Sequence, residues 1–161
     1  MSFFRVVRSV IEAATSSVLS LRRVDIYLQK YPGKDAASGV ADIPYTVTVG
    51  GTRVSPANAR TASDGKMSIR LPAGATATLR IMDTDIQVTL RDTLEAVTTR
   101  HGRQRRLSML GYQLGPNGVD GQRGQYTDRA VLNFQADHHP LTVDGDPGSN
   151  TRTRLTNEVG E

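Results

Sequence analysis

The chain has 161 residues with no cysteine and no tryptophan, which excludes disulfide bonds and thiol catalysis. Its formal net charge of +4 comes mostly from arginine, and a positive balance of this size agrees with an acidic partner without identifying one. The length allows one domain or two small ones.

Residues 1–21 are apolar but interrupted by charged side chains, and we predict an amphipathic N-terminal helix there. Its apolar stripe consists of Phe3, Phe4, Val7, Val10 and Ile11. We expect this stripe to form a protein interface, and packing on the chain's own β region is the alternative. Arg8 and Glu12 argue against a secretory signal, and no run reaches the roughly 18 to 20 apolar residues of a membrane span.

Residues 22–95 change to a period of two, which is typical of half-buried strands. Apolar and polar residues alternate over residues 24–28, 45–49, 67–71, 77–81 and 86–90. Glycine-containing turn sequences separate most of these segments, so we predict a small antiparallel β-sandwich. The phrases IPYTVTV at 43–49 and TASDGKM at 61–67 resemble immunoglobulin-like modules of the carboxypeptidase-regulatory type.

One phrase, D-G-x-x-G-x-x-T, occurs twice in the last third of the chain. The first copy is Asp120, Gly121, Gly124 and Thr127, with Val131 four residues later; the second is Asp144, Gly145, Gly148 and Thr151, with Leu155 four residues later. Each Asp-Gly predicts a turn with a positive-φ glycine. We expect each threonine oxygen to cap a helix N-terminus, and the later apolar residue to face the core.

The residues around these turns complete a recognisable pattern. Upstream are Gln104, Leu107, Leu110, Gly111 and Tyr112; between the turns are Ala130, Val131, Phe134, Gln135 and Leu141. Together, residues 100–158 resemble the peptidoglycan-binding domain family, a small module of three helices. The resemblance implies an α+β protein of two small domains, with a three-helix bundle over residues 96–161. Residues 138–141 (HHPL) depart from the family, which usually has Gly-Leu before the second turn.

The order of a β-sandwich followed by this module, joined by residues 94–98, resembles small accessory proteins of contractile injection systems, such as type VI secretion systems and phage-tail-like particles. This resemblance implies a structural adaptor at the spike, hub or baseplate. Its partners would be other subunits of the particle, and it would be assembled in the cytoplasm and contact the cell envelope during action.

A peptidoglycan-binding module is the alternative function, with Tyr112, Arg123, Tyr126 and Gln135 as candidate glycan contacts. Aromatic residues are scarce, which favours the adaptor. A cell-wall lytic enzyme is a third reading.

Catalytic and metal signatures are weak, so we predict a non-catalytic protein without metal or cofactor. The sequence contains no H-E-x-x-H, and the adjacent His138 and His139 are expected to diverge rather than chelate one ion. Asp144, Asp146 and Asn150 are explained by the turn and lack the spacing of an EF-hand. The arginine cluster of residues 100–106 has no interleaved aromatic residues, which disfavours nucleic acid and favours a solvated helix face.

Overall fold

The computed structural model describes residues 21–32, 38–91 and 93–160, and the backbone of residues 3–8. The fold is α+β, with antiparallel strands in two sheets and three helices. The strands are β1 (Phe3–Arg8), β2 (Leu21–Gln29), β3 (Tyr45–Val49), β4 (Thr52–Arg53), β5 (Lys66–Pro72), β6 (Thr76–Ile81) and β7 (Thr84–Thr89). The helices are α1 (Arg100–Met109), α2 (Gln125–Asp137) and α3 (Ser149–Val159).

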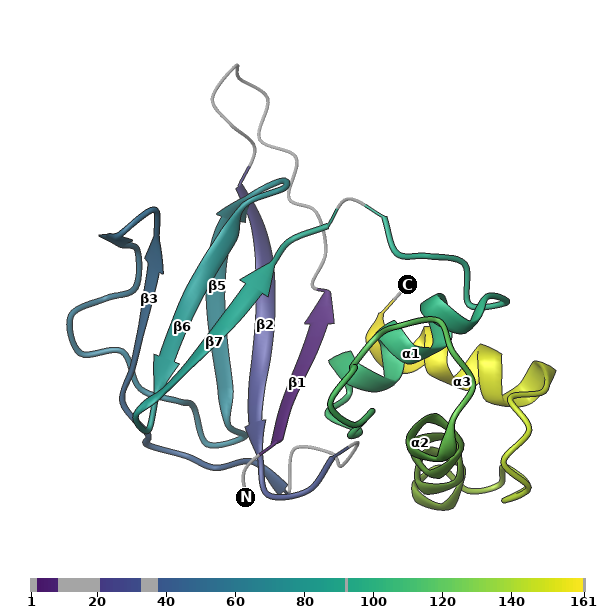
Figure 1. Cartoon of the computed structure of the whole chain (residues 1–161). Coiled ribbons are helices and arrows are strands. Elements are labelled where there is room, and N and C mark those ends of the chain that lie inside the picture. The colour runs from purple at the N-terminus through teal and green to yellow at the C-terminus, as the bar shows by residue number, and fades with distance from the viewer. Residues whose placement is uncertain (1–2, 9–20, 33–37, 92, 161) are drawn as a thin grey trace.

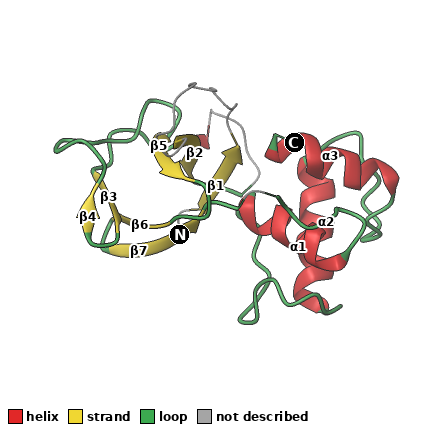
Figure 2. Ribbon diagram, turned by 90° about the horizontal axis from the view of Figure 1, so that it is seen from above, coloured by secondary structure: helices red, strands yellow, loops and turns green. Residues whose placement is uncertain are grey.

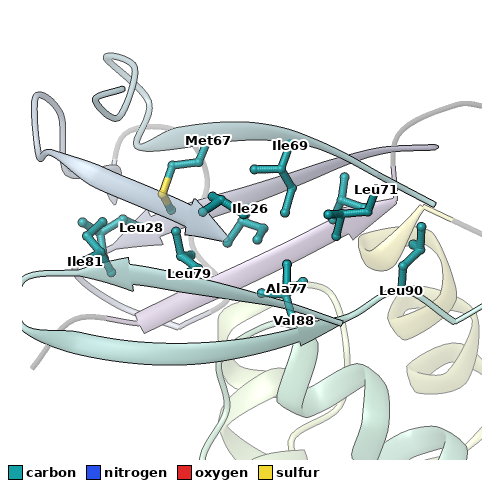
Figure 3. Packing of buried hydrophobic residues seen from close by; sticks show 12 residues of the cluster. Ile26, Leu28, Met67, Ile69, Leu71, Ala77, Leu79, Ile81, Val88 and Leu90 are labelled. Carbon is teal, nitrogen blue, oxygen red and sulfur yellow. The ribbon is translucent and has the colours of Figure 1, made fainter. Parts of the chain in front are cut away.

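The two sheets have the strand orders β1-β2-β5 and β4-β3-β6-β7, and they face each other in the view of Figure 2. Their shared core follows from the alternation in sequence. On β5, Met67, Ile69 and Leu71 are buried while Ser68 and Arg70 are exposed. Figure 3 shows these apolar side chains and those of the opposite sheet pointing into the space between the sheets.

The hairpin turns are of two kinds. Gly50 and Gly51, the two residues between β3 and β4, both have positive φ, which a two-residue hairpin turn of type I′ requires. Between β6 and β7 the same role falls to Met82 and Asp83, with φ of 46° and 58°. This second turn has no glycine to mark it, so the sequence pattern did not identify it.

The helix predicted for residues 1–21 is wrong over the described part, because Phe3–Arg8 forms strand β1. Its backbone pairs antiparallel with β2, from Phe3 opposite Gln29 to Arg8 opposite Val24. The pairing satisfies backbone groups along one side of β2, and β-branched residues such as Val6 and Val7 suit a strand. Residues 9–20, with Val10 and Ile11, lie outside the described residues.

The three helices enclose a second core, formed by Leu107, Leu110, Tyr112, Leu114, Ala130, Val131, Phe134, Leu155 and Val159. Leu94 and Val97 of the connecting segment pack against it, and α1 and α3 also contact β1 (Figure 1). Two separate cores agree with two units, although the domain boundaries at residues 21 and 95 stay predictions. No helix in the described parts of the chain has the length and apolar character needed to cross a bilayer.

Helix α1 ends at a glycine with positive φ. Gly111 adopts φ of 88°, and its N–H donates to the carbonyl of Ser108. The N–H of Tyr112 donates to the carbonyl of Leu107 at 2.9 Å. These two bonds form a Schellman motif, which satisfies carbonyls that the helix would otherwise leave unpaired.

Candidate functional site

The first repeated turn is built around the side chain of Gln104, which is only 1% exposed. Its Nε2 donates to Asp120 Oδ1 at 2.9 Å, to the carbonyl of Gln122 at 3.0 Å and to Thr127 Oγ1 at 3.0 Å. Its Oε1 accepts from the N–H of Gly121 at 2.7 Å. One buried carboxamide therefore connects α1, the turn and the start of α2.

Gln135 repeats this arrangement at the second turn and is also 1% exposed. Its Nε2 donates to Asp144 Oδ1 at 2.8 Å, to the carbonyl of Asp146 at 2.9 Å and to Thr151 Oγ1 at 3.2 Å. Its Oε1 accepts from the N–H groups of Asp144 and Gly145. The two copies of the phrase thus fold into two equivalent networks, which we call the Gln104 hub and the Gln135 hub.

The prediction that the two threonines cap helices is wrong. The residues at the helix N-caps are Gly124 and Gly148, and Thr127 and Thr151 lie three residues inside. Each threonine oxygen instead accepts from the hub glutamine. The sequence spacing correctly linked the threonine to the turn, but the donor belongs to the preceding helix and could not be seen from local spacing.

Two of the four predicted glycan contacts are interior residues. Tyr112 is 3% exposed; its hydroxyl donates to Asp137 Oδ2 at 3.0 Å, and its ring packs edge-to-face on Phe134. Gln135 is committed to its hub. Their roles are structural, because a ligand at the surface would have to displace these internal hydrogen bonds.

The other two predicted contacts are at the surface. The side chain of Arg123 is 76% exposed, with Nε 3.7 Å from Asp128 Oδ2. Tyr126 is 46% exposed, and its ring lies so close to Gly115 that a Cβ there would be 2.5 Å from it. Of the two, only Arg123 lines the groove described next.

A groove of about 470 Å³ lies between the two repeated turns and the first turn of α1. Its charged lining consists of Arg100, Arg103, Arg123, Asp128, Asp144 and Asp146; Thr127, Val131, Gly145 and Pro147 complete it. The sequence pattern did not indicate this groove, because it is assembled from residues of α1, both turns and α2. The sequence signal that could have indicated it is the pair of equivalent turns together with Arg100 and Arg103 at the start of α1.

The arginine cluster is less solvated than predicted. Arg106 is 4% exposed and donates to the carbonyls of Glu95 and Gly102, each at 2.8 Å. Arg105 donates to the Glu95 carboxylate at 3.0 Å. These two arginines attach the connecting segment to α1, while Arg100 and Arg103 line the groove.

Burial lowers the pKa of the Arg103 guanidinium below its usual value, the charges of Arg152 and Arg100 lower it further, and Asp146 opposes them. Arg103 also donates to the carbonyl of Thr98 at 2.7 Å, which fixes its position. Hydrogen bonds from the Asp146 backbone and from Gln135 lower the pKa of Asp144, because they stabilise its charged form.

His138 is a buried residue at the C-terminus of α2. Its Nδ1 lies 2.8 Å from the carbonyl oxygen of Phe134, and its ring stacks on Phe134. His139 is exposed. In the described ranges, no cluster of three or more histidine, aspartate or glutamate side chains has the arrangement of a metal site.

Residues 103–155, about a third of the chain, match the model of the family described as "Putative peptidoglycan binding domain". The match covers both hubs and most of the groove. No curated protein and no solved structure matches the chain.

Proposed function

We propose that the helical region binds bacterial cell-wall peptidoglycan without cleaving it, and that the groove between the repeated turns is the binding surface. The observation that carries the proposal is the position of most of the groove inside the segment that matches a peptidoglycan-binding family. The hubs support it, since each holds one wall of the groove by hydrogen bonds to a buried glutamine. Such a fixed surface reduces the ordering cost of binding.

The experiment is a pull-down of the full chain on insoluble sacculi. We expect saturable binding that the double variant Arg100→Gln/Arg123→Gln weakens at least tenfold. Arg129→Gln is the matched control, because Arg129 is an exposed arginine of α2 that does not line the groove. Equal loss in the control, or no saturable binding by the wild type, would contradict the proposal.

The absence of cleavage is tested on the same sacculi. The matched family is a binding domain, and Asp144 in the groove is engaged by Gln135 and the Asp146 backbone. We expect no release of soluble fragments over hours at the protein concentration that saturates binding. Release that persists in a freshly repurified sample would assign a lytic activity instead.

A second candidate is a structural adaptor in a contractile injection particle, as the order of the two parts suggests. A surface of the two-sheet region supports it: a groove of about 710 Å³ lies beside strand β5, at the edge of its sheet. Leu21 and Val54 are half-exposed in its lining, next to Val49 and Ile69. Exposed apolar side chains of this kind are suited to protein contacts.

Particle preparations from the source cell test the adaptor. The adaptor is supported if the wild type co-purifies with particles and the double variant Leu21→Ser/Val54→Ser does not. Sacculus binding should be unchanged in that variant. A protein found only on sacculi, and never with particles, would exclude this candidate.

A further inference from the structure

We infer that the groove recognises the peptide stem of peptidoglycan, through its carboxylate and ammonium groups, and not the sugar chain. This inference rests on the proposed function. Peptidoglycan offers two chemically different surfaces: a sugar chain with broad pyranose faces, and short peptides that carry free carboxylates and, at a diamino acid, a free ammonium group. The lining of the groove distinguishes between them.

The groove contains both signs of charge. Arg100 and Arg103 enter from the first turn of α1, and Arg123 enters from the first repeated turn. Asp128 comes from α2, and Asp146 lies in the second repeated turn. A ligand with a single charge would pair with either the arginines or the aspartates, and an uncharged ligand would pair with neither. A peptide that carries a carboxylate and an ammonium group can pair with both.

The cations are arranged to accept a carboxylate. A guanidinium presents a planar set of N–H donors that matches the two oxygens of a carboxylate. Arg103 is held by its bond to the carbonyl of Thr98, and Arg100, three positions earlier on α1, lines the same groove, so the two guanidinium groups share one side of the helix. An incoming carboxylate relieves their mutual repulsion.

The anions are not equivalent. The Asp144 carboxylate accepts from the Asp146 N–H at 2.9 Å and from Gln135 at 2.8 Å, so it is part of the hub. Asp128 is only 3.7 Å from Arg123, and its side chain is 45% exposed. The side-chain carboxylates of Asp128 and Asp146 line the groove outside these hub bonds, so we assign them to the ammonium group.

Sugar recognition has little support in the same lining. Pyranose rings are usually bound against an aromatic face, and none of the described residues that line the groove is aromatic. Its apolar part consists of Val131 and Pro147, which can contact small side chains such as the methyl group of alanine. The exposed Tyr126 lies outside the lining.

The test compares three forms of the wall polymer with the full chain: intact sacculi, glycan strands from which an amidase has removed the peptides, and intact sacculi with free stem peptide as competitor. We expect binding to intact sacculi, at least tenfold weaker retention by stripped strands, and release by the peptide. A stem peptide with amidated carboxylates should compete at least tenfold less well.

Two variants test which residues of the groove bind the carboxylate and which bind the amine of the peptide. Arg123→Gln should remove the difference between free and amidated peptide, and Asp128→Asn should remove the difference between peptide with a free and an acetylated side-chain amine. Arg129→Gln should preserve both differences. All three positions are on the surface of the helical region, and circular dichroism confirms the fold of each variant.

The outcomes separate this inference from the function on which it rests. Equal binding to intact and stripped strands, without competition by peptide, would overturn stem recognition and leave peptidoglycan binding in place. No binding to intact sacculi would overturn both.

Discussion

The Nε2 of Gln104, in helix α1, lies 3.0 Å from the Oγ1 of Thr127, which is 23 positions later in helix α2. The same relationship joins Gln135 and Thr151 between helices α2 and α3. Both glutamines are almost completely buried. Each threonine of the repeated phrase therefore accepts a hydrogen bond from a side chain of the previous helix. Each copy of the phrase thus contains one partner of a contact between two consecutive helices.

Replacement of either hub glutamine by alanine should destabilise the helical region by about 2–4 kcal/mol, because several polar partners lose their hydrogen bonds inside the protein. Chemical denaturation of Gln104→Ala and Gln135→Ala measures this. Gln125→Ala is the control, since Gln125 is exposed at the start of α2. A loss below 0.5 kcal/mol in a hub variant would show that water replaces the carboxamide without cost.

Gly102→Ala should be strongly destabilising, by about 2 kcal/mol or more, through steric overlap. A Cβ at this position would lie 2.0 Å from the carbonyl oxygen of Ala96, in the connecting segment. Gly148→Ala is the matched control, because nothing lies within 4 Å of its Cβ and its φ is −60°. Thermal melts of the two variants should differ clearly, and similar melting temperatures would argue that the connecting segment moves aside.

Glu95 should make stability depend on pH in the acid range. The hydrogen bond from Arg105, followed by a bond to its own backbone, lowers the pKa of Glu95 from 4.5 to about 2. Since the folded-state pKa is the lower one, the stabilisation is complete above pH 4.5 and is lost as the pH falls towards 2. Its side chain is 33% exposed, so solvent screening limits the effect to about 1–2 kcal/mol.

Urea denaturation of the wild type and Glu95→Gln between pH 2 and pH 7 tests this assignment. The difference in unfolding free energy should be largest at neutral pH and should shrink on acidification. A difference independent of pH would indicate that the hydrogen-bond geometry, and not the charge, carries the contribution.

Tyr112→Phe should lower stability by about 1–2 kcal/mol through loss of the hydrogen bond to the Asp137 carboxylate. Sacculus binding should be unchanged at saturating protein, since Tyr112 is buried. Tyr126→Phe is the matched control for stability, because Tyr126 is exposed and its change should stay within 0.5 kcal/mol. A Tyr112→Phe variant with full stability and impaired binding would restore Tyr112 as a ligand contact.

Much of the fold could be predicted from local patterns. The period of two located β2, β3, β5, β6 and β7, and the repeated phrase located the two turns before α2 and α3. Gly121 and Gly145 have the positive φ that the Asp-Gly pairs predicted. These features depend on neighbours in the sequence, so spacing is sufficient to find them.

Features that depend on distant partners were missed. Strand β1 forms because β2 is there to pair with it, and the apolar residues of Phe3–Arg8 fit a helical stripe equally well. The sequence predicts Gln135 as a glycan contact, because a polar residue in a motif resembles a binding residue. Its burial follows from the packing of α2 against the second turn, which the sequence spacing does not show.

The two hubs also differ in one respect that matters for protein engineering. Gln104 precedes its turn aspartate by 16 positions, whereas Gln135 precedes its own by 9. The same network thus closes around connections of unequal length, and the additional residues are accommodated in the longer one. In this longer connection, between Gln104 and Asp120, Pro116 and Asn117 are exposed. A side chain on Gly118 would meet no atom within 4 Å. A fluorophore or an affinity tag could accordingly be inserted after Asn117 while both networks stay closed.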